Sequence, residues 1–176
     1  MRLFIATDIS EELREEAKNI LNKIDFKASK VPVKNLHITL KFLGEVENTK
    51  KIEHQLKNIE FQEFFITSKN LGFFPNEQNI KVFWIGFEEN QLLLNLHRKI
   101  SASLPDLKDD FKYSPHLTIA RINYLDAKNK NRLLKIKEKG IKKTTFKVSS
   151  FKLMKSTLTS KGSVYEVLKT FKAKAL

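Results

Sequence analysis

Two short segments of this 176-residue chain repeat one pattern, and that pattern constrains the fold more than any other feature. His37-Ile38-Thr39-Leu40 and His116-Leu117-Thr118-Ile119 each alternate a polar with an aliphatic side chain. Alternation with a period of two is typical of a β-strand that buries one face and exposes the other. Each segment is therefore predicted to present an imidazole and a hydroxyl on one face of a sheet. If the two strands meet across a cleft, both His-Thr pairs surround one small group.

The remaining periodicity predicts an α+β fold with antiparallel sheets. Ser10 is suited to cap a helix whose apolar residues recur through Ile24, and Pro105 ends a later helix. Helices and strands follow one another without the regular βαβα order of a parallel sheet. The expected helices cover residues 11–24, 52–59, 92–104 and 127–139. The expected strands cover residues 2–8, 36–43, 64–71, 80–87, 115–120, 145–153 and 164–171.

Positive charge is concentrated in the second half of the chain. Residues 1–88 carry 13 basic and 13 acidic side chains, whereas residues 89–176 carry 20 basic and 7 acidic ones. A one-sided basic field is typical of proteins that bind polyanions, so nucleic acid is the expected partner. The charge is also compatible with a solvated lysine-rich surface, because 28 of the 33 cations are lysines.

Composition excludes several other classes of protein. The chain has no Cys, which rules out disulfides, thiolate metal sites and a thiol nucleophile. No apolar run approaches the roughly 18 residues that a membrane span needs. The apolar stretch after Met1 is too short for a signal peptide, and no flexible linker interrupts the chain. We therefore expect a single domain over residues 1–176, monomeric, cytoplasmic and without membrane contact.

Two imidazoles around a phosphate suit an in-line displacement. One ring can deprotonate the nucleophile while the other protonates the leaving oxygen, and hydroxyls can stabilise the phosphate oxygens. Neither strand contains Asp or Glu, whereas a metal site needs three or four ligands, so no metal or other cofactor is expected. His54 and His97 fall in predicted helices beside polar neighbours and are interpreted as surface or half-buried residues.

With these residues, the chain resembles the two-histidine phosphoesterase superfamily, and within it the RNA 2′,3′-cyclic phosphodiesterases also called 2′-5′ RNA ligases. The resemblance extends over nearly the whole sequence. It is carried by the initial segment Arg2–Ala6, by His37–Gly44, by Pro115–Arg121 and by the closing segments around Ser156–Leu158 and Tyr165–Leu168. It implies two pseudo-symmetric α+β lobes, of about residues 1–88 and 89–176, whose antiparallel sheets flank a central cleft.

The resemblance also implies metal-free hydrolysis of an RNA-terminal 2′,3′-cyclic phosphate to a 2′-phosphomonoester. His37 would be the proton donor and His116 the proton acceptor, while Thr39 and Thr118 would bind the phosphate. Arg121 is carried over as a phosphate or RNA contact. Simple alternation places Arg121 on the face opposite to His116, so a β-bulge or the strand end must redirect it.

Contacts to the RNA beyond the phosphate are less defined by the sequence. Tyr113 is a candidate for stacking on the terminal base, whereas Phe42 shares the parity of Leu40 and is expected in the core. Lysines of the basic helix and its surroundings could follow the RNA backbone or form a solvated face; they are Lys135, Lys137, Lys139, Lys142 and Lys143.

Several functions remain open from sequence. The same site could join RNA ends as a 2′-5′ ligase, act on tRNA-type fragments, or open another cyclic phosphate. A non-catalytic basic RNA-binding module is the alternative from a different class. The paired His-Thr strands disfavour that alternative, because binding a phosphate backbone requires cations and not imidazoles.

Overall fold

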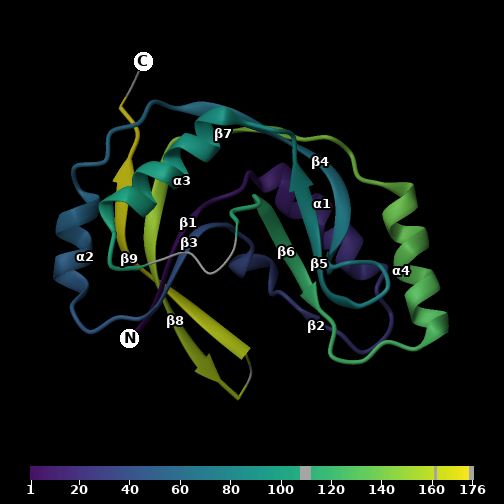
Figure 1. Ribbon diagram of the computed structural model, residues 1–176. Helices are drawn as coiled ribbons and strands as arrows, with labels where there is room; N and C mark the ends of the chain where they lie inside the picture. Colours follow the sequence, from purple (N-terminus) through teal and green to yellow (C-terminus); the bar gives the residue numbers. More distant parts are fainter. Residues whose placement is uncertain (108–111, 161, 175–176) are drawn as a thin grey trace.

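The chain folds into two antiparallel sheets with helices packed around them (Figure 1). The computed structural model describes residues 1–107, 112–160 and 162–174. Sheet A has four strands in the order β3-β1-β8-β9, and sheet B has five in the order β2-β6-β5-β4-β7. The strands are β1 Arg2–Thr7, β2 Ser29–Lys30, β3 Ile38–Glu45, β4 Phe64–Pro75, β5 Ile80–Phe87, β6 His116–Arg121, β7 Thr145–Val148, β8 Ser150–Thr159 and β9 Gly162–Lys172. The α-helices are α1 Glu11–Asn22, α2 Thr49–Leu56, α3 Gln91–Ser103 and α4 Ala127–Lys139, and a 3₁₀ turn, η1, covers Val33–Asn35.

Local sequence signals account for where these helices begin. The side chains of Ser10, Asn48, Asn90 and Asp126 each accept a hydrogen bond from the backbone N–H three residues later. Such caps satisfy N–H groups that have no partner inside the helix. The α+β class and the helix at residues 127–139 agree with the sequence-based expectation, and the short strand β2 and the turn η1 are additions to it. The single strand expected over residues 145–153 is wrong: β7 and β8 replace it and belong to different sheets, because the chain crosses from one sheet to the other at residue 149.

Both sheets combine strands from both halves of the chain. Sheet A joins β1 and β3 to β8 and β9, and sheet B joins β2, β4 and β5 to β6 and β7. The boundary expected near residue 88 therefore does not separate the two sheets. Strand pairing depends on the tertiary fold, so the two halves of the sequence do not form one sheet each.

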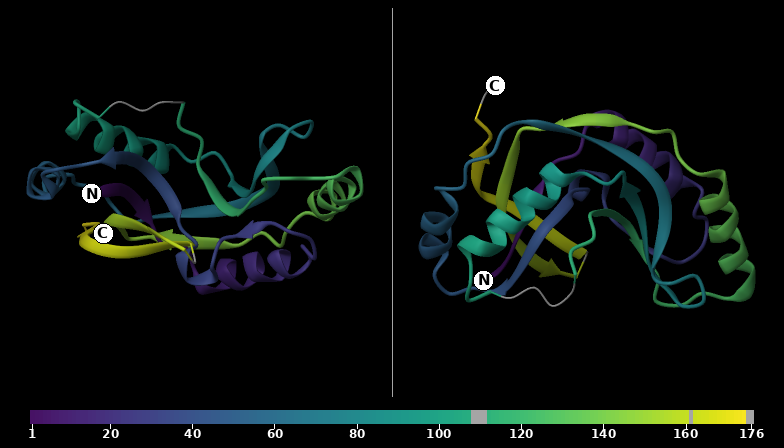
Figure 2. Two further views of the ribbon diagram at one scale, coloured as in Figure 1. Left: turned by 90° about the horizontal axis from the view of Figure 1, so that it is seen from below. Right: turned by 45° about the horizontal axis from the view of Figure 1, so that its top comes forward.

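One hydrophobic core extends through both sheets. The side chains of Ile38, Leu40, Leu117 and Ile119 are at most 1% exposed and belong to this core. Their burial confirms the prediction that the aliphatic face of each His-Thr strand points into the core. Helix α1 follows β1 of sheet A but contacts β6 of sheet B. Helix α3 follows β5 of sheet B but contacts β3 of sheet A, so these two helices cross from one sheet to the other (Figure 2).

Within the described part of the chain, no helix is long and apolar enough to cross a membrane.

Candidate active site

Strands β3 and β6 contact each other and carry the two His-Thr pairs. His37 lies just before β3, with Thr39 inside it, and His116 and Thr118 lie on β6. All four side chains are half-buried, opposite to the core-facing aliphatic residues. The charge of His116 lowers the pKa of His37, after the larger effect of burial, so the two rings lie within electrostatic range.

The two imidazoles are held in the same way. Nδ1 of His37 lies 2.6 Å from the carbonyl oxygen of Asn35, and Nδ1 of His116 lies 2.7 Å from that of Ser114. A carbonyl oxygen only accepts, so Nδ1 must be the donor in both rings. The nitrogen that exchanges a proton is therefore Nε2 in each case. Nε2 of His37 lies 3.1 Å from the hydroxyl oxygen of Thr39.

Aromatic side chains surround both imidazoles. The His37 ring lies 4.9 Å from that of Phe4 and 5.4 Å from that of Tyr165, between centroids. The His116 ring lies 4.9 Å from that of Phe74, edge to face. This burial lowers the pKa of both histidines, because a charged imidazolium is poorly solvated there.

Charged neighbours distinguish the two rings. For His37, the hydrogen bond to Asn35 and the nearby carboxylate of Asp8 oppose the lowering of the pKa by burial. For His116, the hydrogen bond to Ser114 opposes it, whereas the guanidinium of Arg121 lowers the pKa further. The charges therefore favour protonation of His37 and disfavour protonation of His116.

A β-bulge in each strand redirects the side chains that follow the threonines. In the pairing of β6 with β5, Ile119 is an extra residue between Thr118 and Ala120, and both Ile119 and Ala120 are buried. Arg121 therefore returns to the face of His116, where it is exposed and close enough to affect that ring. This is the redirection that the sequence required for Arg121.

The same bulge occurs at Leu40 of β3, and it corrects the expectation for Phe42. Leu40 is the extra residue in the pairing with β1, and Leu40 and Lys41 are both buried. Phe42 consequently lies on the site face, with 64% of its surface exposed, and not in the core. Its position in β3 corresponds to that of Arg121 in β6, because Phe4 pairs with Phe42 as Val82 pairs with Arg121.

Comparison with known protein families also finds that the two halves of the chain correspond to each other. The family model described as LigT like Phosphoesterase matches the chain twice, over residues 3–84 and 85–165. The chain belongs to the LigT-like phosphoesterase family. An RNA 2′,3′-cyclic phosphodiesterase of Methanocaldococcus jannaschii is 40% identical over 172 residues, covering 96% of this chain and 99% of the relative. One of Thermotoga maritima is 35% identical, covering 96% and 93%.

Solved structures of the family share the fold. A crystal structure of a Thermus thermophilus protein has a TM-score of 0.78 at 28% identity, covering 98% of this chain and 97% of that chain. Escherichia coli LigT, crystallised with 3′-AMP, has the same TM-score at 23% identity and the same coverage. The two-sheet architecture is therefore that of the LigT-like phosphoesterases.

Hydrogen bonds from outside β3 position His37 in this LigT-like phosphoesterase, and the sequence alone did not identify them. Nη1 of Arg14, on α1, lies 2.6 Å from the carbonyl oxygen of Val33 in η1. The side-chain amide of Asn35 donates to the carbonyl oxygen of Ser163 on β9 at 2.9 Å. The turn η1, whose last carbonyl orients His37, is thus tied to α1 through Val33 and to β9 through Asn35.

Tyr113, the candidate for base stacking, is itself stacked on His97. The two ring centroids are 3.9 Å apart and the planes differ by 11°. The phenol oxygen is buried without a hydrogen-bond partner in the described residues, and burial raises its pKa well above the usual value. His97 is half-buried, as expected, and covers one face of the tyrosine. Base stacking by Tyr113 stays a prediction.

Three of the five basic-cluster lysines form ion pairs. Lys137 pairs with Glu77, Lys142 with Glu12 at 2.9 Å, and Lys143 with Glu88 at 2.6 Å. Lys135 and Lys139 are exposed on α4, which lies at the outer end of the molecule, away from β6 (Figures 1 and 2). RNA binding by Lys135, Lys137 and Lys139 stays a prediction. Because α4 lies away from β6, only an RNA that extends beyond the histidines could reach these lysines.

Residues 1–107, 112–160 and 162–174 contain no group of three or more His, Asp or Glu side chains placed so that they could hold a metal ion.

Proposed function

We propose that this LigT-like phosphoesterase hydrolyses the 2′,3′-cyclic phosphate at an RNA end to a 2′-phosphomonoester, without a metal ion. The observation that carries the proposal is the matched pair of histidines, each with Nδ1 held by a carbonyl and Nε2 left to exchange a proton. The relatives are RNA 2′,3′-cyclic phosphodiesterases, which supports a cyclic phosphate at an RNA end as the substrate.

In the proposed reaction, proton transfers accompany one substitution at phosphorus. Nε2 of neutral His116 accepts a proton from water as the water oxygen bonds to phosphorus. The bond between phosphorus and O3′ breaks, and Nε2–H of protonated His37 donates its proton to O3′. The products are a 3′-hydroxyl and a 2′-phosphomonoester, with His37 neutral and His116 protonated. Exchange of one proton with solvent at each ring restores the starting state.

The charged neighbours support this division of roles. Asp8 favours the protonated form of His37, which the donor requires, and Arg121 favours the neutral form of His116, which the acceptor requires. Arg121 also places a guanidinium on the site face, where it can bind the anionic phosphate.

The threonine hydroxyls complete the proposed phosphate site. Thr39 and Thr118 lie on the same faces as the histidines and would donate to the non-bridging oxygens of the phosphate. The hydroxyl of Thr39 is already within hydrogen-bond distance of Nε2 of His37, at 3.1 Å. The proposed phosphate position is therefore next to the nitrogen that donates the proton.

The test is hydrolysis of a short RNA with a terminal 2′,3′-cyclic phosphate in the presence of EDTA. We expect full activity and a single product with a 2′-phosphate, identified by ³¹P NMR. A variant with both His37→Ala and His116→Ala, purified in the same way, is the control for contaminating nucleases. Loss of activity in EDTA that a divalent ion restores would overturn the metal-free mechanism, and a 3′-phosphate product would overturn the role given to O3′.

RNA fragments that end in a cyclic phosphate, tRNA fragments among them, are the proposed substrates of a monomeric, cytoplasmic enzyme. Each chain carries both histidines, so the site is complete in one copy. Light scattering with size-exclusion chromatography tests the monomer, and a dimer at assay concentration would contradict it.

A further inference from the structure

The indole of Trp84 lies flat on sheet B beside the candidate active site. Strand β5 places Trp84 directly opposite Thr118 of β6 and Gly72 of β4. The ring centroids of Trp84 and His116 are 6.4 Å apart. Trp84 is the one tryptophan of the chain, and it is half-buried. Its side chain therefore shares a face of the sheet with the acceptor histidine and its threonine.

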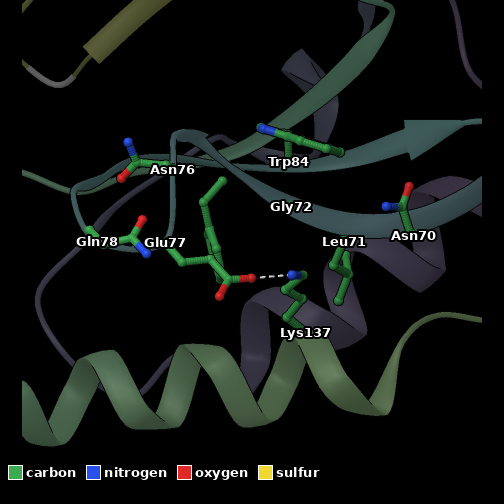
Figure 3. A pocket seen from close by; sticks show the side chains of 9 residues that line it. Asn70, Leu71, Gly72, Asn76, Glu77, Gln78, Trp84 and Lys137 are labelled. Carbon is green, nitrogen blue, oxygen red and sulfur yellow. Dashed lines mark hydrogen bonds and ion pairs between the residues drawn. The ribbon is translucent and has the colours of Figure 1, made fainter.

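Two glycines allow the indole to lie in this way. A Cβ atom on Gly72 would come within 2.2 to 2.7 Å of three atoms of the six-membered ring, and one on Gly86 would come within 2.8 Å of the ring. Three neighbouring ring atoms at similar distances place the Gly72 Cα beneath the ring face and not at the ring edge. Figure 3 shows the indole lying along the strands, on the face opposite to Leu71 and Lys137.

The indole has an aromatic and a polar neighbour on its own side of the sheet. The ring of Phe74 lies 5.0 Å from that of Trp84, between centroids. The hollow of about 330 Å³ that Trp84 borders is lined on the other face by Leu71 and Lys137, so it is not a site on the face of His116. The side-chain oxygen of Asn70 lies next to Gly86, 2.7 Å from where a Cβ would be, and therefore beside the indole. The indole Nε1–H has no acceptor in the described residues, so packing and not hydrogen bonding holds the ring.

We propose that the face of the Trp84 indole turned away from Gly72 is the surface on which a nucleobase of the bound RNA end stacks, with the exposed amide of Asn70 beside the edge of that base. A flat aromatic ring next to a phosphate site binds an unpaired base, because every base has a face that can stack. The proposal rests on the proposed function, which places the phosphate between the two histidines. It favours Trp84 over Tyr113, because Trp84 pairs directly with Thr118 on the face that carries His116.

The single tryptophan makes the test direct. Adenosine 2′-monophosphate, the expected product for adenosine, is titrated while tryptophan fluorescence is recorded and binding is measured separately by equilibrium dialysis. We expect saturable quenching with the same dissociation constant by both methods. Ribose 2-phosphate, which lacks the base, should bind more weakly and leave the fluorescence unchanged. Binding of the adenosine compound without quenching would overturn the stacking proposal and leave the proposed function standing.

Kinetics supply the second readout. Trp84→Leu should raise KM for adenosine 2′,3′-cyclic phosphate by roughly 10-fold, the order expected from stacking one base, with kcat changed much less. Trp84→Phe should retain most of the affinity. Gly72→Ala should act like Trp84→Leu, because the new methyl group displaces the indole. Phe65→Leu is the matched control, since Phe65 is also exposed on β4 but pairs with β7. An unchanged KM in folded Trp84→Leu would overturn the proposal, whereas no hydrolysis by the wild type would overturn the proposed function itself.

Discussion

At the scale of single residues, the two histidines have the same hydrogen-bond geometry and different charged neighbours. Each Nδ1 donates to the carbonyl oxygen two residues earlier, and for His37 that carbonyl belongs to the turn η1. Asp8, just after β1, and Arg121, at the end of β6, act on the pKa of one ring each. Hydrogen bonding therefore leaves Nε2 available in each ring, and the charged neighbours differ in the direction that the proposed donor and acceptor roles require.

The first prediction concerns pH. Activity should rise with pH as His116 loses its proton and fall as His37 loses its own. Burial lowers both pKa values below the usual 6.5, so the maximum of kcat/KM should lie on the acidic side of that value. Arg121→Gln removes a cation that lowers the pKa of His116, and should move the acidic limb to higher pH. Asp8→Asn removes an anion that raises the pKa of His37, and should move the alkaline limb to lower pH.

The measurement is kcat/KM for a 2′,3′-cyclic mononucleotide across the pH range. Lys143→Gln, which changes a charge paired with Glu88, is the matched control and should move neither limb. If Asp8→Asn shifts the acidic limb and Arg121→Gln the alkaline one, the donor and acceptor roles are reversed.

A second prediction concerns removal of the reacting groups. His37→Ala and His116→Ala should each reduce kcat/KM by roughly 10²–10⁴-fold, the contribution of one general acid or base. The double variant should be little worse than either single one, because the two groups act in one step. Thr39→Val and Thr118→Val should cost less, since each loses one hydrogen bond to phosphate and no proton transfer.

Thermal unfolding is the companion measurement for these variants. Folding should be little affected, because Ile38, Leu40, Leu117 and Ile119 bury the opposite face of each strand. A substrate with a better leaving group in place of O3′ should rescue His37→Ala selectively. Rescue of His116→Ala instead would contradict the assigned roles.

At the scale of elements, η1 connects helix α1, strand β9 and His37. Arg14 holds the carbonyl of Val33, and Asn35 donates to Ser163 while its own carbonyl accepts from His37. The turn thus transmits the position of two packed elements to one imidazole. Nδ1–H of His116 donates in the same way to the carbonyl oxygen of Ser114. Within the described residues, the side chain of Ser114 makes no hydrogen bond that would correspond to that of Asn35.

The third prediction tests this turn. Asn35→Ala keeps the backbone carbonyl and removes the side-chain hydrogen bond to Ser163. A hydrogen bond of this kind contributes about 1 kcal/mol to stability. We expect kcat to fall several-fold with KM nearly unchanged, because binding groups remain while the donor is less well oriented. Histidine NMR should show a changed titration of His37 and an unchanged one of His116. Equal changes at both rings would indicate a general loss of structure. Asn129→Ala, at a distant helix cap, is the control.

At the scale of the whole molecule, the exchange of strands makes the two halves interdependent. β8 and β9 complete the sheet that contains β1 and β3, whereas β6 pairs with β5 of the first half. The equivalent bulges at Leu40 and Ile119 show that the two strand pairs repeat one design. A repeated sequence has therefore produced two similar sheets that share a single core.

The fourth prediction follows from this exchange. Fragments 1–88 and 89–176, made separately, should each lack a cooperative unfolding transition, because each loses the partners of strands in both sheets. Mixing them should restore β-sheet circular dichroism and some hydrolytic activity, since the histidines come from different fragments. A half that unfolds cooperatively alone would contradict the interdependence and support two autonomous lobes. The intact chain under the same conditions is the reference.

Local patterns in the sequence determined most of the strands, the cap of the first helix and the faces on which the two His-Thr pairs lie. Two-residue alternation placed His37, Thr39, His116 and Thr118 opposite the core because the strand pleat depends only on neighbouring residues. Ser10 capped its helix for the same local reason. These features needed no knowledge of which strands pair.

Only the tertiary structure decided where Phe42, Arg121 and Trp84 lie. An extra residue in one strand is defined by the partner strand, so the bulges at Leu40 and Ile119 reversed the parity expected for Phe42 and supplied the redirection required for Arg121. The place of the indole depends on glycines of two strands, one of them in β4. Ion pairs likewise set the surroundings of Lys137, Lys142 and Lys143 through distant carboxylates. Contacts between residues far apart in the chain are set by packing of the whole fold, which a local pattern does not contain.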